Sequence, residues 1–373
     1  MKGRTTSSKL GTLACAVVVL ATISASAQTY KILHAFRFPE GAFDPGAGLV
    51  RDGSGNLYGN SPISIWQLTP DSSVNVRLSY SAGQGHSASA IDGAGNIYGT
   101  AEGVGRAPYG LVFELTPDGR QKILYTFGPA PDGSEPAGLI RDSAGNLYGV
   151  TYYGGAFDQG TVWKINAADG SYEILHNFTG GSDDGGQPNR IVVDGSGNIY
   201  GTAGAGGALN YGIVYKLGAD GQLTNLHNFS EGERLPGAML LDGQGNLYGT
   251  TGACTGTSCG ELFRIDAVGN YTVVLTFGVA LGNGPALSLV EDRSGNLYGV
   301  TYTGGVSSDC AFCSGVLFKI APDGTASALH TFHGGSDDGY FPVSLILSHG
   351  VLYGTTYQGG KFFIGTVFQY TLQ

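Results

Sequence analysis

Charged side chains are scarce in this sequence, and most of those present are acidic. Only 13% of the 373 residues are Asp, Glu, Lys or Arg, against about 25% in an average globular protein. The formal charge is −10, so the surface repels the phosphates of nucleic acid and anionic lipids. Because 42% of the residues are hydrophobic, the low charge does not indicate disorder. We expect a folded chain that does not bind nucleic acid.

Methionine and cysteine are also rare, whereas glycine and aromatic residues are abundant. The chain has two Met and five Cys, but 65 Gly, 21 Tyr and 17 Phe. This balance favours strands and tight turns over helices. Beyond residue 27, no stretch is apolar enough to predict a membrane-spanning helix. We therefore predict an all-β protein.

The first 27 residues have the pattern of a secretory signal peptide. Three basic residues precede an apolar run from Leu10 to about Ile23, and Ala25, Ser26 and Ala27 form a small-residue cleavage site. The run is shorter than the roughly 20 residues that span a bilayer, which argues against a membrane anchor. Cleavage near Ala27 would change the formal charge from −10 to −13.

This leader predicts a secreted, extracellular or periplasmic protein whose residues 28–373 form a single domain. The strand-like sequence continues to Gln373 without a visible sorting tail. We therefore expect a freely released monomer rather than a surface-anchored one.

A short phrase recurs through the rest of the chain. GNLYG or GNIYG occurs six times, and a degenerate copy, GVLYG, ends at Gly354. The spacing is about 49 residues, close to the period of known propeller-blade repeats. The tyrosines of the seven copies are Tyr58, Tyr98, Tyr148, Tyr200, Tyr248, Tyr298 and Tyr353.

Each repeat contains four apolar segments in a constant order. One unit shows them as PAGLIRD (136–142), GNLYGVTY (145–152), GTVWKI (160–165) and YEILHNF (172–178). Short segments rich in β-branched and aromatic residues, bounded by Gly, Asp, Asn or Pro, are typical of strands. Seven units of four strands predict a seven-bladed β-propeller.

The two ends of the repeat region predict how the blades close into a ring. YKILHAF (30–36) is a segment of the fourth type, and the chain closes on GTVFQY (365–370), a segment of the third type. We therefore expect residues 30–36 to form the outermost strand of the blade built by residues 342–370, which hides both sheet edges. A lipid-facing barrel would need strands of about 9 to 11 residues, longer than these.

The unit PxxLxxDxxGNLYGTTxxGG, followed by GTVFKI and LHxF, resembles the GloVer tandem repeat of a secreted bacterial family described as choice-of-anchor proteins. The resemblance implies a secreted repeat protein and supplies no catalytic residues.

PxGLxxDxxGNLY is also similar to the NHL-type propeller unit, which implies that the P-led segment is innermost and LHxF outermost. The loops between the second and third strands then share a face with the inter-blade loops, and we take this face as the candidate binding surface.

An Asp precedes GN in six repeats, and we predict that it serves the turn. Its carboxylate can accept hydrogen bonds from backbone N–H groups while Gly takes a positive φ. A calcium loop is the alternative, but the run of oxygen ligands and the terminal Glu of an EF-hand are missing. The six are Asp52, Asp92, Asp142, Asp194, Asp242 and Asp292.

The inter-blade loops and the TxxGG loops supply the candidate ligand-binding residues. Paired carboxylates in GGSDDG could bind calcium or act as acid and base on a glycoside, although a structural turn would recur in the same way. Tyrosines beside the TxxGG loops could stack on sugar rings or grip a peptide, or simply pack against neighbouring loops. The candidates are Asp183, Asp184, Asp337, Asp338, Tyr152, Tyr153, Tyr302 and Tyr357.

Four histidines occupy the same place in LHxF, namely His34, His176, His227 and His330. Equivalent positions on different blades are spread around the outer rim, so these side chains cannot converge on one metal ion. We predict structural or solvent-facing roles for them and no metal site.

Four cysteines would remain after cleavage of the leader. Cys254 with Cys259, and Cys310 with Cys313, fall in equivalent loops of adjacent repeats. An oxidising compartment favours disulfides, for which three pairings are possible. We favour the two local pairs; a four-thiolate zinc site and a redox CxxC pair are the alternatives.

These observations predict a secreted, non-catalytic propeller that binds a carbohydrate or an extracellular or cell-envelope protein through the loops of one face. We expect no obligatory cofactor, although calcium would suit the acidic loops. One alternative is an extracellular glycan-cleaving hydrolase or lyase with carboxylates near the central channel. The other is a purely structural component of the envelope.

Overall fold

The computed structural model describes residues 29–46, 48–80, 86–103, 107–233, 236–255, 258–278, 280–305 and 315–372. For residues 86, 253–255, 258, 259, 286 and 287 it describes the backbone alone. Throughout these ranges the regular secondary structure consists of strands. No helix in the described ranges is long and apolar enough to cross a membrane.

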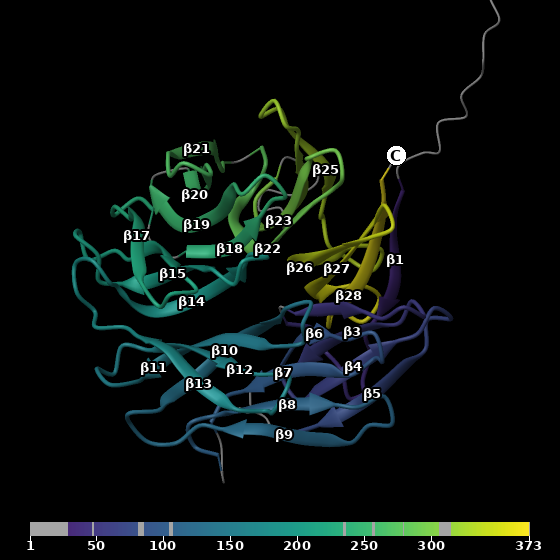
Figure 1. Ribbon diagram of the computed structural model, residues 1–373. Helices are drawn as coiled ribbons and strands as arrows, with labels where there is room; N and C mark the ends of the chain where they lie inside the picture. Colours follow the sequence, from purple (N-terminus) through teal and green to yellow (C-terminus); the bar gives the residue numbers. More distant parts are fainter. Residues whose placement is uncertain are drawn as a thin grey trace, which may run out of the picture.

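Seven antiparallel sheets of four strands each surround a central channel (Figure 1). Blades 1 to 3 contain β2 (Leu49–Arg51), β3 (Leu57–Ser61), β4 (Ser64–Leu68), β5 (Val74–Ser79); β6 (His86–Ile91), β7 (Ile97–Ala101), β8 (Leu111–Leu115), β9 (Gln121–Thr126); and β10 (Gly133–Arg141), β11 (Leu147–Gly154), β12 (Thr161–Ile165), β13 (Tyr172–Asn177). Blades 4 and 5 contain β14 (Gly186–Val193), β15 (Ile199–Ala205), β16 (Ile213–Leu217), β17 (Leu223–Asn228); and β18 (Pro236–Leu241), β19 (Leu247–Thr255), β20 (Ser258–Ile265), β21 (Tyr271–Thr276). Blades 6 and 7 contain β22 (Asn283–Glu291), β23 (Leu297–Thr303), β24 (Val316–Ile320), β25 (Ala326–Thr331); and β26 (Gly339–Ser348), β27 (Val351–Gly359), β28 (Thr366–Thr371), β1 (Tyr30–Ala35). The predicted seven-bladed propeller is confirmed.

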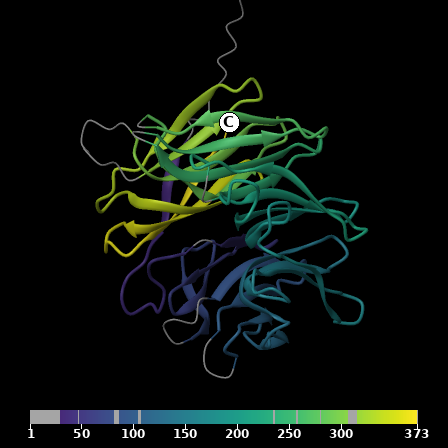
Figure 2. The same cartoon turned by 90° about the vertical axis from the view of Figure 1, so that its left-hand side faces the viewer.

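The seventh blade is completed by the first strand of the chain. β1 pairs antiparallel with β28, with Tyr30 opposite Tyr370 and Ala35 opposite Thr366. In Figures 1 and 2 the purple β1 lies beside the yellow strands of the last blade. The prediction that residues 30–36 form this outermost strand is confirmed.

The strand order within each blade sets the two faces of the molecule. In every blade the P-led strand is at one edge of the sheet and the LHxF-type strand at the other, and the P-led strands of adjacent blades contact one another around the channel. The predicted innermost and outermost strands are therefore confirmed. We call the face that carries the inter-blade loops and the second-to-third-strand loops the loop face, and the opposite one the turn face.

The hydrophobic core lies between the blades rather than within them. Seven buried clusters combine the side chains of neighbouring blades. The Phe that follows an outermost strand packs edge-on against the third-strand aromatic residue of the next blade, as Phe178 does on Tyr215 with ring centroids 5.2 Å apart. The same edge-on contact joins Phe36 to Trp66, Phe127 to Trp163, Phe229 to Phe263 and Phe332 to Phe368, and a tilted contact joins Phe277 to Phe318. These contacts explain the Phe of LHxF, because each seals one blade against the next.

The repeated Asp holds its turn as predicted. In blade 1, Asp52 Oδ1 accepts hydrogen bonds from the backbone N–H groups of Ser54 and Asn56, each at 2.9 Å. Asp52 Oδ2 accepts from the Asn56 side-chain amide and from the Tyr58 hydroxyl. Tyr58 is 6% exposed, and its ring packs in the cluster between blades 1 and 2. The Asp, Asn and Tyr of the repeated phrase therefore form one hydrogen-bonded unit at the turn face.

Candidate functional site

The exposed aromatic side chains in the described ranges all gather on the loop face. Of the other exposed large hydrophobic residues, Leu209 also lies on the loop face, whereas Val76, Ile123 and Val273 lie on outermost strands and Val268 on the turn face. Flat apolar rings standing among polar loops are suited to stacking on a ligand. The seven exposed aromatic residues are Phe38, Tyr109, Tyr153, Phe157, Tyr302, Phe362 and Phe363.

Two of the predicted tyrosines bridge blade boundaries on this face. The Tyr152 hydroxyl donates to Gln187 Oε1 at 3.2 Å, and the Tyr302 ring stacks on Phe341 with centroids 4.8 Å apart. Gln187 and Phe341 each stand directly before a Pro at the start of an innermost strand, and each has a φ of 56°. Residues before Pro normally adopt extended backbone, and Asp44 and Glu135 show the same positive φ before Pro45 and Pro136, so this conformation is a repeated feature of the inter-blade loops. Gln187 and Phe341 carry their side chains toward the tyrosine of the preceding blade.

The predicted tyrosines form two groups rather than one. Tyr152 and Tyr153 of blade 3 contact each other edge-on, whereas Tyr302 and Tyr357 come from the adjacent blades 6 and 7. Burial raises the pKa of Tyr302, and the nearby Tyr357 raises it further. Burial likewise raises the pKa of Tyr152. Both hydroxyls are therefore protonated at neutral pH; that of Tyr152 donates to Gln187, and that of Tyr302 can donate to a ligand.

The four predicted carboxylates divide into two engaged and two exposed ones. Asp184 accepts hydrogen bonds from His176 at 2.7 Å and from the backbone N–H of Thr179. Asp338 is 1% exposed and accepts from His330 and from the backbone N–H of His333. Asp183 and Asp337 are exposed on the loop face, at blade boundaries three blades apart. The structure therefore does not bring the four carboxylates together into one site.

A histidine–carboxylate pair closes four of the blade boundaries. His34 pairs with Glu40 at 2.9 Å, His227 with Glu233 at 3.1 Å, and His176 and His330 with the aspartates just described. Burial alone would raise the pKa of Asp184, but the hydrogen bonds from His176 and Thr179 outweigh it and lower the pKa. Of the structural or solvent-facing roles predicted for these histidines, their ion pairs at the blade boundaries agree with the structural one. In the described ranges no three metal-ligating side chains come together.

The cysteines lie largely outside the described residues. β19 and β20 place Cys254 and Cys259 directly opposite each other in the backbone register, but their side chains are not described. Cys310 and Cys313 fall in the undescribed range 306–314. The two local disulfides remain a prediction, as does cleavage of the leader near Ala27, which lies outside the described residues too.

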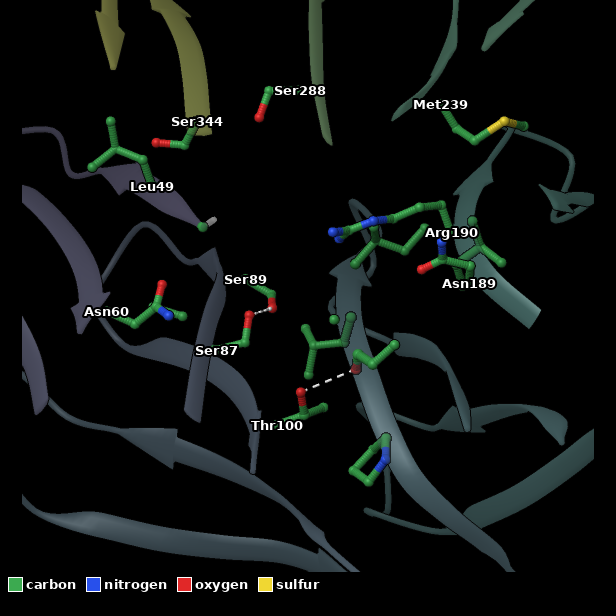
Figure 3. A pocket seen from close by; sticks show the side chains of 18 of the residues that line it. Leu49, Asn60, Ser87, Ser89, Thr100, Asn189, Arg190, Met239, Ser288 and Ser344 are labelled. Carbon is green, nitrogen blue, oxygen red and sulfur yellow. Dashed lines mark hydrogen bonds between the residues drawn. The ribbon is translucent and has the colours of Figure 1, made fainter. Parts of the chain in front are cut away.

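The innermost strands enclose a cavity of about 490 Å³, within the size range of small-molecule sites. Hydroxyl and amide side chains dominate its polar lining, and the cavity extends to Asn60 and Glu102 at the loop-face ends of β3 and β7. Figure 3 shows Arg190 pointing into the cavity, with Ser87 and Ser89 on the opposite side. Glu102 and Arg190 are the only charged residues among the described ones that line it.

Arg190 is absent from the residues that the sequence patterns singled out. The signal that could have found it is a comparison of one position across the seven innermost strands. This position comes directly before the residue that pairs with the last Gly of GNLYG, GNIYG or GVLYG. In blade 4 the residue at this position is Arg190, since Ile191 pairs with Gly201. The equivalent residues of the other blades are Gly48, Ser87, Gly138, Ala238, Ser288 and Ser344. A large cation therefore occupies one of seven positions that otherwise hold only Gly, Ala or Ser.

A protein-family model described as the Gloeobacter/Verrucomicrobia repeat matches residues 82–313 and 235–373. Among curated protein sequences, none matches this chain.

Several solved structures share the fold at low sequence identity. A streptogramin B lyase is 12% identical with a TM-score of 0.63, over 93% of this chain and 98% of that one. An inactive histidine-to-alanine variant of virginiamycin B lyase from Staphylococcus aureus, solved with quinupristin, is 13% identical with a TM-score of 0.59, over 92% of this chain and 100% of that one. The extracellular domain of a protein described as a one-component system of B. thetaiotaomicron is 14% identical with a TM-score of 0.60, over 93% of this chain and 42% of that one.

Proposed function

Because this chain belongs to the Gloeobacter/Verrucomicrobia repeat family, and its repeats build a closed scaffold with aromatic loops on one face, we propose that it is a non-catalytic carbohydrate-binding propeller. The observation that carries the proposal is the gathering of all seven described exposed aromatic residues on the loop face. Loops held by a rigid scaffold are frequent sites of recognition.

A carbohydrate suits this surface better than a protein partner does. The aromatic side chains are distributed around the ring on separate blades, as Tyr153 and Phe157 on blade 3 and Phe362 and Phe363 on blade 7 show. Protein interfaces instead concentrate their binding energy in a central apolar cluster. Separated flat rings among hydroxyl and carboxylate groups match the repeated faces and hydroxyls of an extended sugar chain.

The cavity lining supports a binding role over glycan cleavage. Glycosidases usually need two carboxyl groups about 5 to 10 Å apart, whereas Glu102 is the one carboxylate among the described residues that line the cavity. The similar virginiamycin B lyase loses activity when a histidine is replaced by alanine. Every histidine whose side chain is described lies outside the cavity lining.

The proposed location is outside the cytoplasm, in the periplasm or the medium. The signal-like residues 1–27 support export, and the similar B. thetaiotaomicron propeller is an extracellular domain. We further propose that the protein acts as a monomer.

A glycan array tests the carbohydrate proposal. The wild-type protein should bind at least one polysaccharide, and Tyr153→Ala and Tyr302→Ala should each weaken that binding about tenfold, equivalent to about 1.4 kcal/mol. Val268→Ala, on the turn face, is the matched control and should leave affinity unchanged. A blank array, together with capture of an envelope protein that Tyr153→Ala and Tyr302→Ala abolish, would replace the carbohydrate by a protein partner.

A further inference from the structure

The guanidinium of Arg190 reaches into the central channel. At the equivalent position of the innermost strand, the other six blades carry small side chains. The six residues equivalent to Arg190 are Gly, Ala or Ser, so they leave the centre of the channel open. Arg190 Nη1 extends toward blade 3, where it lies 3.6 Å from the position that a Cβ on Gly138 would take. The cavity would be wider without this side chain, so filling space between blades does not require it.

The charge of Arg190 is uncompensated within the described part of the chain. Its guanidinium forms no ion pair or hydrogen bond with described residues, and Nε is shielded from solvent and without a partner. Burial lowers the pKa of the Arg190 guanidinium, and no neighbouring carboxylate offsets that effect. Glu102 lines the same cavity but forms no ion pair with Arg190. Arg190 is partly exposed, and of its guanidinium nitrogens only Nε is shielded from solvent. Its Nη groups are therefore open to the channel, where an anionic ligand could pair with them.

The groups around Arg190 supply the rest of a binding site. Ser87, Ser89, Ser288, Ser344, Asn60 and Asn189 line the cavity with hydroxyl and amide groups. Ser87 and Ser89 hydrogen-bond each other at 3.0 Å, the Ser344 hydroxyl pairs with Thr355, and the Asn189 amide donates to the Pro236 carbonyl, so a ligand would add to these bonds or replace them. Asn60 Oδ1 is also shielded and without a partner in the described residues. In Figure 3 these side chains surround the space into which Arg190 points. The lining thus offers one fork of N–H donors and several neutral groups that can donate or accept.

We propose that the central cavity is a second binding site, which takes a sugar acid with its carboxylate on Arg190 and its hydroxyls on the surrounding serines and asparagines. A guanidinium matches the two oxygens of a carboxylate in a paired geometry that an ammonium cannot reproduce. Hydroxyls and amides that can both donate and accept match a polyhydroxylated ring. The protein carries a net charge of −10, so this local cation is what lets the channel hold an anion. The cavity does not depend on the aromatic loop face, and Tyr153→Ala leaves it intact.

Titration calorimetry with D-glucuronate tests the site on the full folded chain. Wild-type protein should bind glucuronate at least tenfold more tightly than glucose, and Arg190→Met should reduce glucuronate affinity at least tenfold. Arg190→Lys keeps the charge but not the paired geometry, so its affinity for glucuronate should lie between those of wild type and Arg190→Met. Arg120→Gln is the matched control: it removes a positive charge from the turn face, where the Arg120 side chain is 86% exposed, and should bind as wild type does.

Thermal unfolding separates this role from a structural one. Because Arg190 lacks a partner, Arg190→Met without ligand should melt at or above the wild-type temperature, and glucuronate should raise the melting temperature of wild type alone. A lower melting temperature for ligand-free Arg190→Met would show that the side chain supports the fold and would overturn the proposal. Equal binding of glucose and glucuronate would overturn it as well.

The source of the sugar acid is resolved by a second titration. If the natural ligand is a free sugar acid, monomeric glucuronate should bind at least as tightly as a uronic acid tetrasaccharide. If the site holds the end of a polymer, the tetrasaccharide should bind more tightly than the monomer. Arg190→Met should abolish either mode. Failure of both ligands to bind wild-type protein would overturn the channel site, and the loop-face array would still report independently on the polysaccharide.

Discussion

The last Gly of the repeated phrase is required by an aromatic ring that lies against it. A Cβ added to Gly149 would come within 2.2 Å of Trp163 on the adjacent strand. Gly59 and Trp66, Gly249 and Phe263, and Gly354 and Phe368 show the same close approach. The third-strand ring then receives the Phe of the preceding blade on its other side. The Gly of the repeated phrase, the third-strand ring and the Phe of the preceding blade thus form the packing unit that repeats around the molecule.

Gly149→Ala should therefore destabilise the protein although alanine suits a strand better than glycine does. The added methyl group must displace a fully buried Trp163, which costs about 1 to 3 kcal/mol. Gly195→Ala is the control, because a Cβ there would meet nothing within 4 Å, and its effect should stay within about 0.5 kcal/mol. Urea denaturation of both variants measures the difference, and equal midpoints would contradict the stack.

At the level of single residues, sequence patterns predicted local chemistry but not contacts between blades. The role of the Asp in the turn was predicted correctly because its backbone partners lie within four residues. The pairing of His176 with Asp184 was missed, although both residues were singled out, since a loop must fold back to join them. Arg190 was missed although it stands four residues before the repeated Asp194, as Gly48, Gly138, Ala238 and Ser288 stand before theirs, because the sequence does not show that this position faces the central cavity.

At the level of strands, β1 shows how one segment joins the two ends of the fold. Its register with β28 runs from Tyr30 to Ala35, and Phe36 immediately after it is fully buried against Trp66 of blade 1. The strand thus closes the last sheet while the next residue seals that sheet against the first blade. The type and order of these strands could be predicted because apolar segments and turn residues recur in every unit.

Phe36→Ala should destabilise the protein by about 3 to 5 kcal/mol, the usual cost of removing a buried Phe. The reason is that the substitution leaves a cavity at the boundary where the blade ring closes. Phe38→Ala, two residues later, is the control, since Phe38 is 68% exposed and its loss should cost less than about 1 kcal/mol. Thermal and urea unfolding would report the difference. Similar losses for the two variants would indicate that closure depends on the loop and not on the buried ring.

At the scale of the whole molecule, carboxylates hold both faces together. Hydrogen bonds lower the pKa of Asp52, Asp142 and Asp292 at the turn face against the opposing effect of burial. The same balance lowers the pKa of Glu233 and Asp338 at the loop face. Among the described carboxylates with a shifted pKa, only those of Asp44, Glu261 and Glu291 have it raised. The folded ring thus prefers its carboxylates ionised.

Stability should therefore fall steeply in acid. A carboxylate whose folded pKa is lowered contributes its full stabilisation above its ordinary pKa of about 4 and loses it as the pH falls through the folded value. We expect the urea midpoint to drop progressively from pH 5 to pH 2.5. Asp142→Asn should be less stable than wild type at pH 7 and lose less on acidification. A midpoint independent of pH over this range would contradict the assignment.

The overall architecture was predictable because seven imperfect copies of one unit leave few ways to bury their apolar faces. The candidate sites were predictable only in part. The loop face follows from strand order, and the aromatic side chains of Tyr153 and Tyr302 do lie exposed upon it. The paired aspartates share sequence context but not space, because identical loops on different blades point to different sectors of the ring.

The pairing of β1 with β28 also imposes an order in time. Some 340 residues separate the two strands, so at 5 to 20 residues per second roughly 20 to 70 s of synthesis pass before β1 can meet its partner. During that interval every partial array of blades exposes the apolar faces of its end blades, which are buried between blades in the finished ring and can pack against another chain. The risk of association with another chain is consequently greatest just before the final step of assembly. At that point six sheets are complete, and the seventh still lacks β1, the first strand to be synthesised.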